Sequence, residues 1–313
     1  MAGKETSIAA GIVVFRPDPA LLLPLIEAVA REAAPVFLLA NGPLDPDLAA
    51  RLDAEPVEVI QAPSNLGVAE GFNLCVLAAL LRGKTRILLL DQDSRLASGM
   101  VAALSAAMDE VAAAGECPAV VGPRIVSPIG AETEFKAPRY FARQGFPMIG
   151  AAAPVHYVIS SGSLVDLAAF RVVGPWRSDY FIDGVDTEWC FRAWSKGRSC
   201  WVARESSMEH RIGKGVIKAG LLGRAVPRQP DFRLFAYVRN QVYGLLLAHV
   251  PIGWKMRVIA HTARIVLLSW ADRGFEPRFL AAMSAAMGDG LVGRLGPPPG
   301  AENAAGLDLV VRP

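Results

Sequence analysis

The chain has 313 residues, of which 52% are hydrophobic and 20% charged, and its formal net charge is +2 at pH 7. This length suffices for one large domain, or for a domain of roughly 200 residues with an appendage. The composition predicts a packed core and excludes disorder as the default state. The small net charge and the absence of basic runs or zinc-finger spacing argue against a nucleic-acid-binding protein.

The four cysteines, at positions 75, 117, 190 and 200, are scattered and form no CxxC pair. This spacing argues against a disulfide framework or a zinc site, and it is typical of the reducing cytoplasm. The apolar stretch near the N-terminus is short and lacks the layout of a signal peptide. No uncharged apolar run of about 18 residues occurs, so we expect a cytoplasmic protein without a transmembrane helix.

The first half of the chain alternates short apolar runs with helical stretches. The pattern predicts strands at 8–15, 36–40, 57–61 and 86–90, the start of another at 119–122, and helices at 20–33, 46–54, 70–82 and 99–114. Since the strands are nearly all apolar, the alternation is typical of a parallel sheet with helices on both faces. Ligands of such sheets bind beyond the carboxyl ends of the strands.

Polar, small and acidic residues follow these strands. The four segments are Arg16-Pro17-Asp18, Asn41-Gly42, Ser64-Asn65-Leu66-Gly67 and Asp91-Gln92-Asp93-Ser94. A nucleotide site at the carboxyl edge of the sheet would need residues of these kinds.

Asp91 and Asp93 come directly after a buried strand. Residues two apart in an extended segment point the same way, and paired carboxylates hold Mg²⁺ or Mn²⁺ that bridges to substrate phosphates. The alternative is that the pair caps the next turn. A second pair, Asp45 and Asp47, is predicted to form a turn and a helix cap. For Asp91 and Asp93 the metal-binding interpretation is favoured, because they lie at the edge of the sheet where ligands bind.

The strand and helix pattern loosens over 127–155, which is rich in proline and glycine. A strand at 158–164 and a helix at 185–195 follow, and after about Arg211 the chain is predicted to be helical, at 216–222, 233–249 and 253–270. We therefore expect an α/β sheet domain over 1–215, a helical region over 216–295 and a flexible tail over 296–313.

Several segments resemble glycosyltransferase family 2, and within it the rhamnosyltransferases. Leu88–Ser94 (LLLDQDS) is similar to the metal-binding segment, and Ser64–Asn73 is similar to the Asn-x-Gly…Gly-x-Asn loop. Ile159–Ser163 and Phe181–Arg192 match as well, so the motifs agree in order over about residues 8–240. The resemblance implies the GT-A fold, an α/β fold with a Rossmann-like, mostly parallel sheet, here followed by a helical appendage.

The resemblance also implies an activity. Members of this kind are inverting, metal-dependent enzymes that use Mg²⁺ or Mn²⁺ to move a sugar from a nucleotide-sugar donor to a saccharide hydroxyl. For this chain the implied donor is dTDP-β-L-rhamnose and the implied process is the synthesis of a cell-surface polysaccharide. A UDP- or GDP-sugar is the alternative donor.

The resemblance assigns the donor site to residues at the strand ends and in the loop before the helix at 70–82. Gly67 would allow close approach of the backbone to phosphate at a helix N-terminus; the alternative is a plain loop with a helix cap. The residues implied to seat the donor are Phe15, Arg16, Asn41, Asn65, Gly67 and Asp91.

Asp93 and His210 are the implied metal ligands, since a late histidine joins the acidic pair in related enzymes. A lone histidine is more often structural, which is the alternative for His210. Arg211 and Lys214, nearby in the sequence, would offset the charge of a diphosphate.

Asp186 is the candidate general base, because it corresponds to a carboxylate of the family's Glu-Asp motif, although Val185 stands where the family has an acid. An inverting transferase needs one base to take the proton of the acceptor hydroxyl. Asp183 and Glu188 are rivals in the same segment. Arg239-Asn240 matches a further family feature to which no chemical role is assigned.

Apolar residues recur on one helical face within the predicted helix at 253–270 and just before it, and basic residues flank them. The face consists of Ile252, Met256, Ile259, Ala263, Val266 and Trp270. A basic amphipathic helix of this kind lies on anionic membranes, which would suit a lipid-linked acceptor at the inner face of the plasma membrane. The alternative, slightly favoured, is a helix docked on the sheet domain or on a second copy in a homo-oligomer.

The sequence favours three other classes of protein less. A nucleotidyltransferase usually has a glycine-rich basic loop after the first strand, and Phe15-Arg16-Pro17-Asp18 is not such a loop. A dinucleotide dehydrogenase is suggested only by Gly288–Gly293, which no strand precedes. A non-catalytic sugar-binding protein would need neither the acidic pair nor a base.

Overall fold

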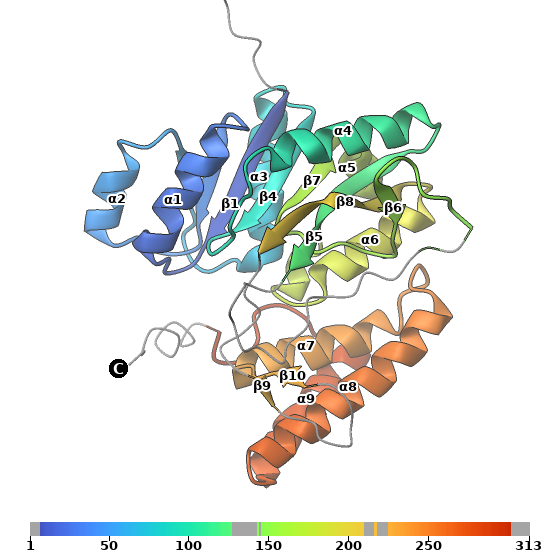
Figure 1. Ribbon diagram of the computed structural model, residues 1–313. Helices are drawn as coiled ribbons and strands as arrows, with labels where there is room; N and C mark the ends of the chain where they lie inside the picture. The colour runs from blue at the N-terminus through green and yellow to red at the C-terminus, as the bar shows by residue number, and fades with distance from the viewer. Residues whose placement is uncertain (1–6, 127–142, 144, 210–215, 218–224, 302–313) are drawn as a thin grey trace, which may run out of the picture.

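The computed structural model describes residues 7–126, 143, 145–209, 216–217 and 225–301. The first part of the chain is built around an eight-stranded sheet (Figure 1), with the strand order β3-β2-β1-β4-β7-β5-β8-β6. The strands are β1 (Ile8–Val14), β2 (Val36–Ala40), β3 (Glu58–Gln61), β4 (Arg86–Asp91), β5 (Pro118–Val126), β6 (Ala152–Pro154), β7 (Ser163–Asp166) and β8 (Ser199–Glu209).

Strands β3, β2, β1 and β4 pair in parallel, as the sequence predicts. Strand β7 is antiparallel to both β4 and β5, and β6 is antiparallel to β8. The result is a mostly parallel α/β sheet in which the ends of β1, β2 and β4 meet at one edge. The expected fold class is confirmed.

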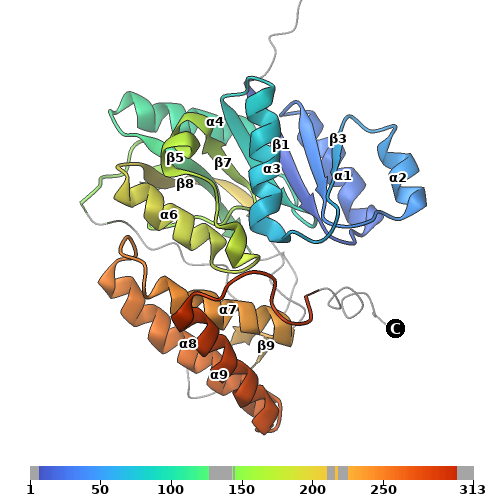
Figure 2. The ribbon, with the colours of Figure 1, turned by 180° about the vertical axis from the view of Figure 1, so that it is seen from behind.

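Helices cover both faces of the sheet (Figures 1 and 2). The helices of this part are α1 (Pro19–Ala30), α2 (Pro46–Leu52), α3 (Gly67–Leu81), α4 (Met100–Ala113), α5 (Leu167–Val173) and α6 (Val185–Ser195), with a 3₁₀ turn, η1, at Ser178–Tyr180. Helices α1 and α4 pack on one face and α3, α5 and α6 on the other. Both faces of each central strand are therefore buried, which explains their nearly continuous apolar sequence.

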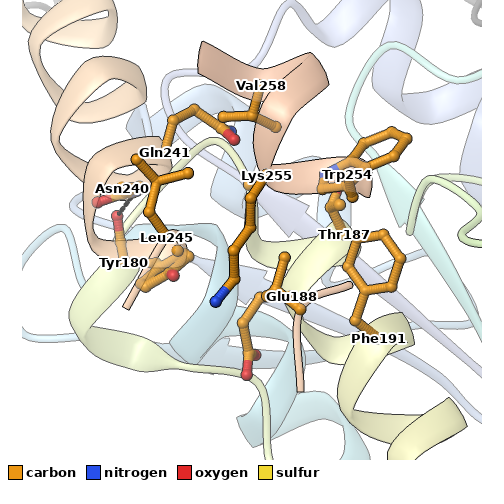
Figure 3. Close-up of a pocket in the computed structure, with 13 residues that line it drawn as sticks. Tyr180, Thr187, Glu188, Phe191, Asn240, Gln241, Leu245, Trp254, Lys255 and Val258 are labelled. Carbon is orange, nitrogen blue, oxygen red and sulfur yellow. Dashed lines mark hydrogen bonds between the residues drawn. The ribbon is translucent and has the colours of Figure 1, made fainter. Parts of the chain in front are cut away.

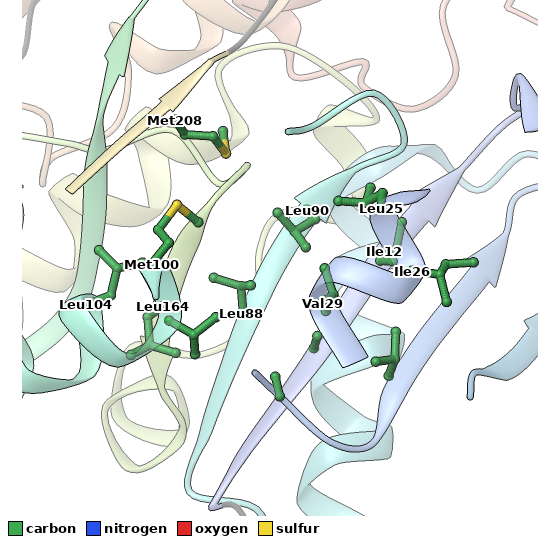
Figure 4. Close-up of a cluster of buried hydrophobic side chains, with 14 of the residues drawn as sticks. Ile12, Leu25, Ile26, Val29, Leu88, Leu90, Met100, Leu104, Leu164 and Met208 are labelled. Carbon is green, nitrogen blue, oxygen red and sulfur yellow. The ribbon is translucent and has the colours of Figure 1, made fainter. Parts of the chain in front are cut away.

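The core between α1, α4 and the sheet is made of aliphatic side chains and methionines (Figure 4). Ile12 of β1 and Leu88 and Leu90 of β4 point into it, and they meet Ile26 of α1 and Leu104 of α4. Alternate residues of the same strands point to the opposite core, as the two-residue period of a strand requires.

Two of the aspartates that follow strands are helix caps. The Asp18 side chain accepts a hydrogen bond from the Ala20 amide at the start of α1. Asp45 accepts from the amides of Asp47 and Leu48 at the start of α2, so the prediction that this acidic pair forms a turn and cap is confirmed.

The helical part that follows contains a short hairpin and three helices. Strands β9 (Val216–Ile217) and β10 (Val226–Pro227) are antiparallel, and α7 (Asp231–Gly244), α8 (Ile252–Asp272) and α9 (Pro277–Val292) pack around their own core. The prediction of a helix at 216–222 is wrong for residues 216 and 217, which form a strand that pairs with β10. Residues 218–222, the predicted domain boundary near Gly215 and residues 302–313 lie outside the described residues.

The apolar face predicted on α8 is exposed over the first half of that helix. Ile252, Met256 and Ile259 expose 75%, 61% and 48% of their surface, whereas Val266 and Trp270 are half-buried. In the part of the chain that the structure covers, no helix is both long and apolar enough to cross a membrane.

Candidate active site

A pocket lies beyond the ends of β1, β2 and β3. Its lining includes Phe15, Arg16, Asn41 and Asn65, which the sequence assigns to the donor nucleoside, together with Gly42, Pro43 and Ser64. The Phe15 amide donates to the side-chain oxygen of Gln92, at 2.7 Å, which ties the end of β1 to the acidic segment after β4. The structure thus brings these four predicted residues together; their contacts with a donor stay a prediction.

Asn41 and Asn65 shape the loop on which the donor would lie. Buried Asn41 donates to the Gly67 carbonyl at 3.0 Å and accepts from the Leu66 amide at 2.9 Å. The side-chain oxygen of Asn65 accepts from the Gly67 amide at 3.0 Å. Both side chains are therefore engaged with the backbone of residues 66–67, and the asparagines fix the geometry of the pocket wall.

Gly67 is the first residue of α3 and has φ of +82°, a conformation that favours glycine. A Cβ atom there would lie 2.5 Å from the carbonyl oxygen of Phe181. The next residue, Val68, donates its amide to the same oxygen at 2.9 Å. The close approach predicted at Gly67 is thus made to the protein's own segment before Asp186, and it joins the loop at 65–67 to that segment.

Asp91 ends β4, and Asp93 follows two residues later. Burial and the charge of Asp93 raise the pKa of Asp91 to about 6, although Arg233 and a hydrogen bond with Ser161 oppose the rise. The Ser161 hydroxyl accepts from the Asp91 amide at 3.2 Å and lies 2.6 Å from the Ser94 hydroxyl. Two carboxylates that repel each other at a buried strand end are a setting in which a cation is stabilised.

The residues present fit a hard divalent cation. Within the described ranges no three histidine, cysteine or carboxylate side chains converge as a metal-binding group. Mg²⁺, however, is usually held by one or two carboxylates, with water and substrate phosphate completing the shell. Asp91 and Asp93 supply that pair, while His210, Arg211 and Lys214 lie outside the described residues.

Asp186 is the second residue of α6, and its carboxylate accepts a hydrogen bond from the Ser160 hydroxyl. Burial raises its pKa to about 6; the hydrogen bond from Ser160 lowers it, and the charges of Asp91 and Asp183 add to the rise. The acidic pair and the candidate base thus share one charged cluster. A carboxylate with a pKa near 6 is suited to take up a proton near neutral pH.

The two rival carboxylates are both held in ion pairs. Asp183 pairs with Arg233 of α7, whose Nε and Nη2 lie 2.9 and 3.0 Å from the two carboxylate oxygens. Glu188 is buried and pairs with Arg192 at 2.9 Å, and the Nε2 atom of His249 lies 2.9 Å away. Burial alone would raise the pKa of Glu188, but these partners lower it. Asp186 makes no ion pair with any described residue, which favours it as the base.

Sequence reasoning did not find the part that α7 plays. Asn240 is buried, and its amide nitrogen lies 2.8–2.9 Å from the carbonyl oxygens of Tyr180, Ile182 and Asp183. Phe181 and Asp183 have positive φ, of 63° and 60°, so this turn is strained. Asn240 therefore holds the turn that leads to Asp186. The sequence signal that could have indicated this role is the Arg239-Asn240 pair, which matches a family feature but is assigned no chemical role.

The chain is similar in sequence to a curated protein, the dTDP-rhamnosyl transferase RfbF of Shigella flexneri. The two are 28% identical over 280 residues, which is 84% of this chain and 89% of the relative. No family model matches the chain.

Solved structures share the fold. TarS 1–349 of S. aureus, in complex with UDP-GlcNAc, superposes with a TM-score of 0.59 at 14% identity, over 91% of this chain and 81% of that one. GalNAc-T7 with UDP, GalNAc and Mn²⁺ gives a TM-score of 0.56 at 14% identity, over 83% of this chain and 55% of that one. Both are glycosyltransferases of the GT-A fold, so the expectation of this fold is confirmed.

Proposed function

We propose that this chain, a glycosyltransferase similar to rhamnosyltransferases, moves L-rhamnose from dTDP-β-L-rhamnose to a hydroxyl of a saccharide acceptor with inversion. The observation that carries the proposal is Asp186, a carboxylate with a pKa of about 6 that is held by Ser160 and shares a charged cluster with Asp91. One base and one acidic pair are the parts that an inverting, metal-dependent transfer requires.

In the proposed reaction the acceptor oxygen attacks the anomeric carbon of the donor sugar. The new carbon–oxygen bond forms as the bond to the diphosphate breaks, and dTDP leaves with the bonding electrons. Asp186 takes the proton of the acceptor hydroxyl. Because the attack comes from the face opposite the leaving group, a β-linked donor gives an α-rhamnoside, and no covalent enzyme intermediate forms.

The other residues act by binding and orientation. Asp91 and Asp93 would hold Mg²⁺ or Mn²⁺, which supplies positive charge against the diphosphate of the leaving nucleotide. Phe15, Arg16, Asn41 and Asn65 line the pocket that we assign to the nucleoside, and Asn41 and Asn65 bond the backbone of residues 66–67 behind it. Arg233, which pairs with Asp183, also acts on the charge of Asp91, so α7 brings one cation to this acidic cluster.

The choice of donor is supported by the curated relative, which is named as a dTDP-rhamnosyl transferase. A UDP-sugar is the second candidate, supported by the structure of TarS with UDP-GlcNAc. The acceptor would be a saccharide of a growing cell-surface polysaccharide, with the enzyme acting in the cytoplasm.

The exposed apolar face at the start of α8 supports a peripheral contact with an anionic membrane. Ile252, Met256 and Ile259 lie beside the cations Lys255 and Arg257, an arrangement typical of interfacial helices. A lipid-linked acceptor would make this contact useful. Sedimentation with phosphatidylglycerol vesicles tests this contact, and Ile259→Glu should reduce the amount of protein that binds to the vesicles. If the wild type is instead a homo-oligomer that Ile259→Glu disrupts, the face is assigned to contact with a second copy of the chain.

One experiment separates binding from chemistry. Calorimetric titration of dTDP with Mn²⁺ should give the same affinity for the wild-type protein and for Asp186→Asn, because Asp186 is assigned to the acceptor. Turnover of dTDP-rhamnose by Asp186→Asn should fall by about 10²–10⁴-fold. Unchanged turnover would remove Asp186 from the mechanism.

A further inference from the structure

Helix α7 places an arginine beside the acidic cluster of the site. Arg233 lies in the first turn of α7, and its Nε and Nη2 atoms lie 2.9 and 3.0 Å from the two carboxylate oxygens of Asp183. The Asp183 side chain exposes only 13% of its surface, whereas that of Arg233 exposes 42%. Because one partner is so open to solvent, the ion pair is weak and its guanidinium can exchange to another anion.

The arginine of the neighbouring helix α6 shows the contrast. Arg192 pairs with the buried Glu188 at 2.9 Å, and its guanidinium also donates to the carbonyl oxygens of Val173 and Pro175, at 3.0 and 2.8 Å. These bonds fix the packing of α6, so Arg192 is committed to the structure. Arg233 is the arginine at this junction whose ion pair faces solvent.

The turn that carries Asp183 does not depend on its ion pair. The side-chain nitrogen of Asn240 lies 2.8–2.9 Å from three carbonyl oxygens of the turn at 180–183, and Figure 3 shows its bond to Tyr180. A fourth carbonyl of the turn accepts from the Val68 amide of α3 at 2.9 Å. Because contacts from two helices hold this backbone, the guanidinium can leave the Asp183 carboxylate without releasing the turn.

The charges around Arg233 are mostly negative. Burial and the charge of Asp93 raise the pKa of Asp91, and the charge of Arg233 opposes that rise. The charges of Asp91 and Asp183 in turn add to the effect of burial on the pKa of Asp186. One guanidinium therefore acts on a group of carboxylates that includes the proposed metal pair, so it lies near the place where a metal-bound diphosphate would bind.

The leaving group of the proposed reaction requires positive charge. When the bond between the anomeric carbon and the diphosphate breaks, the bonding electrons stay on the phosphate oxygen, and the diphosphate gains one negative charge. A divalent metal offsets part of this charge, and a cation held in position offsets more of it. The planar fork of an arginine matches two oxygens of a phosphate as it matches two oxygens of a carboxylate. The geometry with which Arg233 holds Asp183 is thus also suited to a phosphate.

We propose that Arg233 binds the diphosphate of the nucleotide, and that Asp183 holds its guanidinium in position until the phosphate takes the place of the carboxylate on the fork. This role rests on the proposed glycosyl transfer, to which it adds a residue of the helical part. It also gives Asp183 a function other than that of the base.

Substitution of Arg233 tests the contact with phosphate. Arg233→Met should weaken the binding of dTDP in the presence of Mn²⁺ by about tenfold or more, because a charge-assisted bond is lost. The binding of thymidine, which has no phosphate, should stay unchanged. Arg233→Lys keeps the charge and loses the fork, so its affinity for dTDP should lie between those of the wild type and Arg233→Met. Arg228→Met is the matched control, since it removes an exposed ion pair with Asp272 and should bind both ligands as the wild type does.

Substitution of Asp183 separates this role from that of a structural ion pair. Asp183→Asn should bind dTDP about two- to fivefold more tightly than the wild type, because the amide no longer competes for the guanidinium. A structural ion pair predicts the opposite, since Arg233→Met and Asp183→Asn would break the same bond and weaken binding alike. The gain should be absent from the double variant Asp183→Asn/Arg233→Met, because no guanidinium remains to be released.

The full chain is titrated calorimetrically with dTDP, UDP and thymidine in the presence of Mn²⁺, and thermal unfolding shows that each variant folds. The assignment of Arg233 is overturned if Arg233→Met binds dTDP as the wild type does, if it loses thymidine equally, if Asp183→Asn also weakens dTDP binding, or if the gain persists in the double variant. Each of these results leaves the proposed transfer in place. If the wild type binds neither dTDP nor UDP, the proposed transfer falls, and the role of Arg233 falls with it.

Discussion

The side-chain amide of Asn240 donates a hydrogen bond to the carbonyl oxygen of Asp183, at 2.9 Å, three residues before the candidate base Asp186. This bond crosses from the helical part of the chain to the α/β part. The turn that it holds contains positive φ at Asp183, so the position of Asp186 depends on a residue far away in the sequence.

Asn240→Ala should lower kcat by about 10–100-fold and leave the affinity for dTDP unchanged, because the change frees the turn before Asp186 and does not touch the nucleoside pocket. The protein should also lose about 1–3 kcal/mol of stability, since buried carbonyls lose their donor. Kinetics and thermal unfolding measure both effects. Arg228→Ala, which removes an exposed ion pair with Asp272 of the same region, is the control. Loss of dTDP affinity in proportion to kcat would indicate general unfolding instead.

The pH dependence of kcat/KM should report Asp186. A base works only when deprotonated, so with a pKa of about 6 the rate should rise with pH below about 6 and level off above it. Ser160→Ala removes a hydrogen bond that stabilises the charged carboxylate, so the pKa should rise and the ascending limb should move to higher pH. Ser163→Ala, whose hydroxyl donates to the Ile159 carbonyl, should leave the limb in place. An unmoved limb in Ser160→Ala would assign the titration to another group.

The two acidic pairs of the sequence give a matched comparison for metal binding. Asp93→Asn should abolish the Mn²⁺-dependent part of dTDP binding, because one of the two carboxylates becomes neutral. Asp45→Asn should bind dTDP and Mn²⁺ as the wild type does, since asparagine caps a helix about as well as aspartate. Calorimetry with and without EDTA measures this difference. Equal effects of the two substitutions would contradict the assignment of the site.

Gly67→Ala should weaken dTDP binding by about tenfold or more, because the new Cβ atom would lie 2.5 Å from the Phe181 carbonyl and displace the loop. Gly83→Ala is the control: Gly83 also has positive φ, of +65°, but its Cβ position is open. Both variants carry the backbone strain of about 1–2 kcal/mol that a positive φ imposes on alanine. The control carries the strain without the clash, so equal dTDP affinities of the two variants would show that the contact with Phe181 does not shape the pocket.

The first half of the fold was predictable because its signals are local. The strands at β1, β2 and β4 are short apolar runs, and the helices between them carry helical spacing and caps such as Asp45. The same local rule placed Phe15, Asn41 and Asp91 at one edge of the sheet, where the structure brings them together.

The rest depends on contacts between distant residues. Strand β8 (Ser199–Glu209) went unpredicted because Arg204 and Glu205 interrupt its apolar pattern where its register with β5 shifts. The sequence pattern predicts a helix at Val216–Ile217, because the pairing of these residues with β10 depends on a partner elsewhere in the chain and leaves no local signal. The role of Asn240 could not be predicted, because it depends on the contact between α7 and the turn at 180–183, and no spacing in the sequence indicates that these two segments lie side by side.

Donor turnover tests the central claim most directly. Purified protein is incubated with dTDP-rhamnose, UDP-glucose, UDP-galactose or GDP-mannose, with Mn²⁺, Mg²⁺ or EDTA, and the released nucleoside diphosphate is measured. We expect release of dTDP from dTDP-rhamnose that requires the metal and is lost in Asp93→Asn, with slower release from the other donors. No release from any donor, together with no metal-dependent binding of a nucleotide, would contradict the assignment of a sugar transferase site at Asp91, Asp93 and Asp186.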